Sequence, residues 1–241
     1  MQLSSARLKA PVVLYDPTSP SNAFVSLEHG DMPTSLSERA YLLIREQIIS
    51  LKLKPGAIIE ESKLMAELGI GRTPIREALK RLTLENLVRI VPRHGMFVGD
   101  INITDLAHIS EARTVLEGYA ARVAAARATE RQRAKLRELL EELRELKTSE
   151  SHVRLIRIDQ GIHLQMYQAT HNHFLARTLE QYFDLALRIW FLALPRVTRL
   201  QEAVQEHQEL LRALLKRDGE RAEYVIRQHI AGFHEEIKKI L

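Results

Sequence analysis

The chain has 241 residues, of which 45% are hydrophobic and 27% are charged, a composition typical of a soluble globular protein with one or two domains. It contains no cysteine, which excludes a disulfide framework, a thiolate metal site and a thiol nucleophile. The formal net charge is only +4, but residues 34–99 carry 11 basic and 7 acidic groups and so hold the whole excess. A local excess of this kind points to a polyanionic partner.

The N-terminal 33 residues contain four prolines, with Ser, Asn and Gly between them, which interrupt every periodic pattern. We expect residues 1–33 to form a flexible N-terminal arm. No apolar run in the chain reaches the roughly 18 residues that a membrane-spanning helix needs, so no membrane partner is expected. The absence of cysteine also suits a reducing compartment, and we predict a cytoplasmic protein.

Residues 34–99 are predicted to fold as a winged helix-turn-helix. The pattern gives helices in about residues 34–53, 60–68 and 72–82, a tight turn at 69–71, and short apolar runs at 87–91 and 95–98. The last two runs are joined by Pro-Arg-His and predict a β-hairpin, the wing. Three helices followed by a hairpin is the order of a winged helix-turn-helix domain, which reads DNA.

The third of these helices carries the donors that a recognition helix needs. Arg72 and Arg76 are four residues apart and share a face, and an arginine can contact a guanine edge through two hydrogen bonds. Thr73 and the helix N-terminus suit a phosphate. In the wing, His94 is a donor beside Gly95, which is small enough for close backbone approach. The alternative is a basic, solvated helix with no role in DNA binding.

From residue 104 onwards the sequence shows helical periodicity and no strand signal. Six helices of about 15–25 residues, joined by short loops, are expected to make residues 104–241 an all-α bundle. The predicted fold class is therefore mainly α, with an N-terminal winged helix-turn-helix followed by a bundle of about six helices.

Four potential metal ligands are distributed over three helices of this bundle. Asp159 and His163 are four residues apart and point to one side of a helix, while His207 and His229 lie in the middle of the last two helices. One oxygen and three nitrogen ligands suit Zn²⁺, Ni²⁺, Mn²⁺ or Fe²⁺, and zinc is our first choice. The alternative for each histidine is a buried side chain with ordinary hydrogen bonds.

Four short motifs resemble the DNA-binding domain of the GntR family of bacterial transcription regulators. They are Leu53-Lys54-Pro55-Gly56, Leu64-Met65-Ala66-Glu67-Leu68-Gly69, Arg72-Thr73-Pro74-Ile75-Arg76-Glu77-Ala78-Leu79 and Gly95-Met96-Phe97-Val98, within a resemblance that runs from Ser37 to Gly99. The resemblance implies that operator DNA is contacted by Arg72, Thr73, Arg76, His94 and Gly95.

Residues 104–241 resemble the FCD ligand-binding domain of the FadR subfamily within the GntR family. The matching residues are Glu111, Arg113, Leu116, Glu117, Asp159, His163, Asn172, Glu206, His207 and His229. The resemblance implies that Asp159, His163, His207 and His229 bind a metal ion. It also implies that Arg113 approaches a small organic acid, the effector.

We therefore expect a transcription regulator, specifically a repressor, that binds a roughly palindromic operator as a homodimer. A small carboxylate bound near the metal ion would change its affinity for DNA. The alternative is a metal-dependent hydrolase in which the ion activates a water molecule. No HExxH motif is present and no general base can be placed from the spacing, which favours the regulator.

Overall fold

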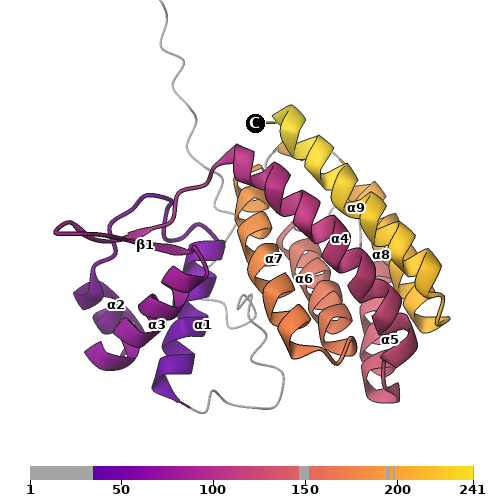
Figure 1. The fold of residues 1–241 in the computed structure, drawn as a ribbon, viewed down its shortest axis with the longest axis horizontal. Coiled ribbons are helices and arrows are strands. Elements are labelled where there is room, and N and C mark those ends of the chain that lie inside the picture. The colour runs from indigo at the N-terminus through magenta and orange to yellow at the C-terminus, as the bar shows by residue number, and fades with distance from the viewer. Residues whose placement is uncertain (1–34, 147–151, 194–195, 198, 241) are drawn as a thin grey trace, which may run out of the picture.

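The computed structural model describes residues 35–146, 152–193, 196–197 and 199–240 (Figure 1). The arm predicted for residues 1–33 lies outside this part of the chain. The described elements are α1 (Leu36–Ile49), α2 (Glu61–Leu68), α3 (Arg72–Leu84), β1 (Val88–Val91), β2 (Gly95–Val98), α4 (Ile103–Arg127), α5 (Glu130–Glu145), α6 (His152–Ala169), α7 (His173–Ala193), α8 (Leu200–Leu215) and α9 (Gly219–Ile240). This order confirms the predicted fold class. None of the helices described here is both long enough and apolar enough to cross a lipid bilayer.

The N-terminal domain, residues 35–99, has its own apolar core beneath the hairpin. Ser35 caps α1 by accepting a hydrogen bond from the Glu38 N–H at 3.1 Å. The turn between α2 and α3 begins at Gly69, whose φ of 63° lies in the left-handed region that glycine adopts readily. The side chains of α3 that face inward, including the fully buried Leu79 and Leu82, pack with those of α1. This packing leaves the opposite face of α3 exposed.

The wing is a two-stranded antiparallel sheet. Val88 pairs with Val98 at its base, and Val91 pairs with Gly95 beside its tip. Val88 and Val98 are buried in the N-terminal core, whereas the residues at the tip are exposed. The hairpin is therefore anchored at one end and projects from the domain at the other (Figure 1).

The helical domain, residues 103–240, is built around α4. This helix packs against α6, α7, α8 and α9, and Figure 1 shows it lying along α9. Four alanines, Ala120, Ala121, Ala124 and Ala125, are almost fully buried in the core of the domain. Because alanine has only a methyl side chain, the neighbouring helices can approach α4 closely.

The two domains meet where α1 packs on α7 (Figure 1). Arg45 of α1 donates through Nε and a terminal nitrogen to both carboxylate oxygens of Asp184 in α7, and the two side chains are 9% and 4% exposed. Arg188, one turn further along α7, donates to the backbone oxygen of Gly99 at 2.5 Å. Leu185 packs against the apolar core of the N-terminal domain. One helix of the helical domain therefore positions the N-terminal domain.

Replacing Asp184 with alanine should strongly destabilise the contact between the domains. Arg45 would stay buried without the carboxylate to which it donates, a change that typically costs about 3–5 kcal/mol. Urea denaturation of the full chain measures the loss. Arg221→Ala, which removes the exposed pair with Glu209, is the matched control and should cost less than about 1 kcal/mol.

The double variant Arg45→Met, Asp184→Leu should recover most of the stability, because an apolar pair leaves no unpaired charge in the interface. Equal losses for Asp184→Ala and Arg221→Ala would show that the buried pair has no special role.

Candidate DNA-binding surface and metal centre

The exposed face of α3 carries the predicted recognition residues. Arg72, Thr73 and Arg76 are exposed, whereas Ile75 between them is fully buried. Gly71 caps the helix without a side-chain hydrogen bond, so the backbone N–H groups of the first turn stay available to an anion. Arg76 forms an ion pair with the partly buried Glu61 at 3.3 Å, and its own side chain stays 57% exposed. The first turn of α3 thus offers two guanidinium groups and a hydroxyl to solvent.

The wing presents the other two predicted DNA contacts. His94 and Gly95 are exposed at the tip of the hairpin. Gly95 has a φ of 103°, a conformation that side chains disfavour, and so the turn requires glycine at this position. The structure places all five predicted residues on the surface of the N-terminal domain, on α3 and on the hairpin. Their contact with DNA stays a prediction.

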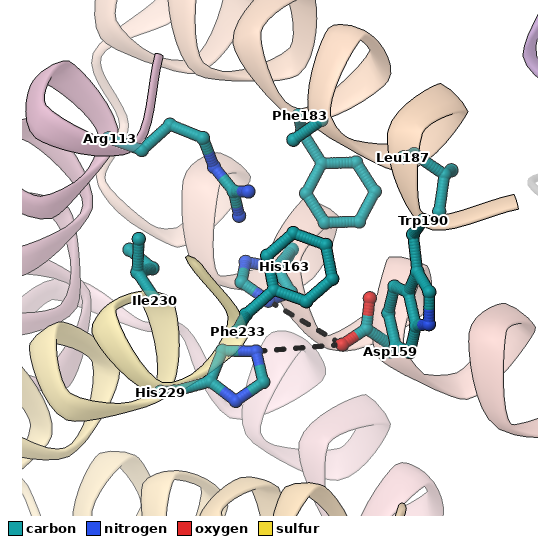
Figure 2. Close-up of a pocket in the computed structure, with 10 residues that line it drawn as sticks. Arg113, Asp159, His163, Phe183, Leu187, Trp190, His229, Ile230 and Phe233 are labelled. Atoms are coloured by element: carbon teal, nitrogen blue, oxygen red, sulfur yellow. Dashed lines mark ion pairs between the residues drawn. The ribbon is translucent and has the colours of Figure 1, made fainter. Parts of the chain in front are cut away.

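The structure brings the four predicted metal ligands together in the middle of the helical domain. Asp159, His163, His207 and His229 are buried, and one ligand atom from each lies within 4.8 Å of the others. Asp159 Oδ1 is 2.8 Å from His207 Nε2, 3.8 Å from His163 Nε2 and 3.9 Å from His229 Nε2. Figure 2 shows His163 and His229 both directed at this carboxylate oxygen.

Each imidazole is held by a hydrogen bond on its far side. The Nδ1 atoms of His163, His207 and His229 lie 2.7 Å from Glu117 Oε2, 2.8 Å from the Ala203 backbone oxygen and 2.9 Å from Glu206 Oε2, respectively. Since carboxylate and carbonyl oxygens only accept, Nδ1 carries the proton in each ring. A neutral ring then has its lone pair on Nε2, facing the cluster, as metal-binding histidines require.

The cluster contains buried polar atoms that lack hydrogen bonds. Asp159 Oδ1, His163 Nε2 and His207 Nε2 have none of acceptable geometry, and a buried polar atom without a partner costs about 1–3 kcal/mol. A divalent cation would satisfy all three at once. One carboxylate oxygen and three imidazole nitrogens also match the ligands that Zn²⁺, Ni²⁺, Mn²⁺ and Fe²⁺ accept, so the residues fit the predicted ion.

Protons compete with a metal ion for this cluster. Burial alone would lower the pKa of His207, but the Asp159 carboxylate raises it above its usual value, so a second proton on His207 can stand in for an ion. Burial and the neighbouring His207 lower the pKa of His229 to about 4. Burial would raise the pKa of Asp159, yet His207 and the other histidines lower it to about 2. Near neutral pH, Asp159 is therefore ionised and His229 is uncharged.

Arg113 and Glu117 link the cluster to α4. Arg113 Nε donates to Glu117 Oε1 at 2.5 Å, and the other carboxylate oxygen of Glu117 holds His163. Burial would raise the pKa of Glu117, but Arg113 and His163 lower it to about 2. Neither contact, that of Glu117 with His163 or that of Glu206 with His229, was predicted from the sequence. The position of Glu117, four residues after Arg113 on the same helix, could have indicated their contact. No sequence spacing relates Glu206 to His229, which lies 23 residues away on another helix.

A small cavity lies beside the cluster, with about 300 Å³ of empty space when the open solvent at its mouth is included (Figure 2). Its lining combines Arg113 and three members of the cluster with apolar side chains from α7 and α9: Arg113, Asp159, His163, Phe183, Ala186, Leu187, Trp190, His229, Ile230 and Phe233. The predicted effector residue and three of the four predicted metal ligands therefore share one cavity.

Comparison with known proteins identifies both domains. Residues 36–98 match the family model of bacterial regulatory proteins, gntR family, and residues 108–232 match that of the FCD domain. The HTH-type transcriptional repressor GlaR of Escherichia coli (strain K12) is 29% identical over 205 residues, which cover 82% of this chain and 93% of GlaR. The HTH-type transcriptional repressor RspR of the same strain is 24% identical over 205 residues, which cover 85% of this chain and 90% of RspR.

Solved structures share the fold. That of E. coli McbR/YncC has a TM-score of 0.76 and 24% identity, and covers 86% of this chain and 98% of its own. That of a putative transcriptional regulator GntR from Rhodococcus sp. RHA1 has a TM-score of 0.69 and 20% identity, and covers 86% of this chain and 100% of its own. The likeness therefore extends over both domains.

Replacing Arg76 with alanine should weaken DNA binding by about 5–150-fold, since loss of a two-bond contact to a base costs about 1–3 kcal/mol. Fluorescence anisotropy on a DNA site selected in vitro by the wild-type protein measures the affinity at fixed salt. Arg131→Ala removes an equally exposed charge from α5 and is the control. Equal affinities for wild type and Arg76→Ala would show that α3 does not read the DNA through this residue.

Proposed function

Because this chain belongs to the GntR family of bacterial transcription regulators and has an FCD domain, and is therefore a DNA-binding regulator, we propose that it is an effector-controlled repressor. A small carboxylate, bound beside a divalent metal ion in the helical domain, changes its affinity for operator DNA. The relatives GlaR and RspR are named repressors. The family and the relatives are those of a transcription regulator and not of an enzyme, so the hydrolase alternative has no support.

The observation that carries this proposal is the cavity that Arg113 shares with the buried cluster. Asp159, His163, His207 and His229 would hold the ion, with zinc as the first choice. The ion would supply positive charge and a coordination position for a ligand oxygen. Figure 2 shows the guanidinium of Arg113 reaching toward the same space. An arginine and a metal ion facing one small cavity suit a carboxylate.

Helix α7 offers a route from the cavity to the N-terminal domain. Phe183 and Leu187 line the cavity, while Asp184 and Arg188, each the next residue along α7, hold Arg45 and the Gly99 carbonyl. A ligand that changes the position of α7 would thereby change the placement of α1. Such a ligand changes the affinity for DNA only if it binds one arrangement of the two domains more tightly than another.

We also propose that the protein binds DNA as a homodimer in the bacterial cytoplasm, with one recognition helix in each half of a palindromic operator. Val115 and Tyr119 on α4 and Tyr224 on α9 are 52–56% exposed. These two helices lie side by side (Figure 1). Large, exposed hydrophobic side chains on two neighbouring helices support an interface with a second copy.

Purification without chelator, followed by elemental analysis, tests the metal site. We expect about one zinc, nickel, manganese or iron ion per chain, and its loss in His163→Ala, because three ligands and a cavity hold the ion less tightly than four. His173→Ala, which removes an exposed histidine, is the matched control. Wild-type protein that takes up none of these four ions from solution would refute the metal site.

DNA anisotropy in the presence of small carboxylates tests regulation. With metal-loaded wild-type protein, at least one of acetate, lactate, hexanoate, gluconate, adipate and citrate should lower DNA affinity by about 5–150-fold, the usual range of coupling between two sites. Arg113→Met should abolish the effect but keep the affinity for DNA. Arg131→Met, which removes an exposed charge, should respond like wild type. A response that is equal in Arg113→Met and wild type would contradict the role of Arg113.

A further inference from the structure

The cavity beside the metal cluster is apolar over most of its wall. Six of its ten lining residues are aromatic or aliphatic: Phe183, Ala186, Leu187, Trp190, Ile230 and Phe233. The other four are Arg113 and three members of the cluster. No serine, threonine, asparagine or glutamine is among the described residues that line it. Apart from the two histidines, the only neutral polar group in these lining side chains is the indole nitrogen of Trp190, a buried donor without a hydrogen-bond partner among the described residues.

The aromatic rings sit close to the polar end of the cavity. The ring of Phe183 lies 4.8 Å from that of His163, and the guanidinium carbon of Arg113 lies 5.2 Å from the Phe183 ring centre. The rings of Trp190 and Phe233, from α7 and α9, are 5.4 Å apart. A ligand whose charged group meets Arg113 and the metal ion would therefore have its remaining atoms against rings and aliphatic side chains.

The buried charges around the cavity leave room for one negative charge. With a divalent ion and neutral histidine ligands, Arg113 is offset by Glu117, and Asp159 offsets half of the charge of the ion. Glu206, which holds His229, is offset by Arg199. One positive charge is left. A single carboxylate neutralises it, whereas a second carboxylate would lie in an apolar site without a counter-charge, which is strongly unfavourable.

Resting on the function proposed above, we propose that the effector is a monocarboxylate with an apolar body. Hydroxylated acids, such as sugar acids, would lose the hydrogen bonds that their hydroxyl groups make to water and find almost no protein partners in return. Dicarboxylates would bring the uncompensated second charge. In this inference Phe183, Leu187, Trp190 and Phe233 determine specificity, while Arg113 and the metal ion recognise the carboxylate.

Three six-carbon acids separate these possibilities. Gluconate is hexanoate with five hydroxyl groups added, and adipate is hexanoate with a second carboxylate. Trp190 is the only tryptophan of the chain and lines the cavity, so its fluorescence reports binding directly. Titration of the zinc-loaded, full-length protein should give a dissociation constant for hexanoate at least about 10-fold lower than for gluconate or adipate. Apolar pockets exclude hydroxylated analogues by up to about 100-fold.

A polar group placed in the wall should reduce this preference. Phe233→Gln puts an amide beside the ligand body at a position that is only partly buried. We expect the ratio of the hexanoate and gluconate constants to fall several-fold. Phe174→Gln, the same change at a phenylalanine that is 74% exposed, should keep the wild-type ratio. Circular dichroism reports whether either variant is folded, and the wild-type ratios test the inference without any variant.

The outcomes distinguish this inference from the function on which it rests. Gluconate or adipate binding as tightly as hexanoate would overturn the apolar class and leave a carboxylate-controlled regulator in place. Failure of all three acids to bind the zinc-loaded protein, together with no response to the wider set of carboxylates in the DNA assay, would overturn the proposed function as well.

Discussion

The buried ion pair between Arg45 and Asp184 is the contact on which the arrangement of the two domains depends. Both side chains are nearly inaccessible to water, so each charge is tolerated only because the other is present. The pair is directional, since the planar guanidinium meets both carboxylate oxygens. Separating the domains, or rotating them, exposes or unpairs these charges. The interface therefore specifies one orientation of α1 on α7 more strongly than apolar packing would.

Inside the helical domain, carboxylates likewise fix neighbouring helices relative to one another. Glu117 accepts a hydrogen bond from Arg113 on one carboxylate oxygen and from His163 on the other, and so links α4 to α6 at the cluster. Glu206 does the same between α8 and α9 through His229. These carboxylates orient the rings that face Asp159, and their replacement would alter the cluster without removing a single one of its four members.

The parts of the molecule that the sequence predicts are those with a local signal. The alternation of Ile75 and Leu79 with Arg72 and Arg76 follows the period of a helix, so it separates the inner and outer faces of α3. The spacing of Asp159 and His163 places them on one face for the same reason. That His207 and His229 meet this pair depends on how three helices pack. The placement of the histidines therefore indicated a metal site only as one of two alternatives, and the resemblance to a known family favoured it.

The features that were not predicted join distant positions through long side chains. Arg45 and Asp184 are 139 residues apart, and neither stands in a motif that marks it for a partner. Glu206 adjoins His207 in the sequence, but it points away from that ring and holds His229 of another helix. No periodicity encodes such contacts, because they are fixed by the crossing of helices and by the need to pair buried charges.

Helix α7 carries both residues that line the cavity and residues that hold the N-terminal domain, and this limits how a ligand can act. Phe183 and Asp184 are adjacent, and so are Leu187 and Arg188, so each cavity residue is fixed to a residue of the domain interface by one peptide unit. Because α7 is a rigid helix, a cavity residue cannot move without the neighbouring interface residue moving with it. Because the buried ion pair tolerates little stretching before a charge is left unpaired, a ligand that displaces α7 would favour a second discrete arrangement of the domains over a gradual shift.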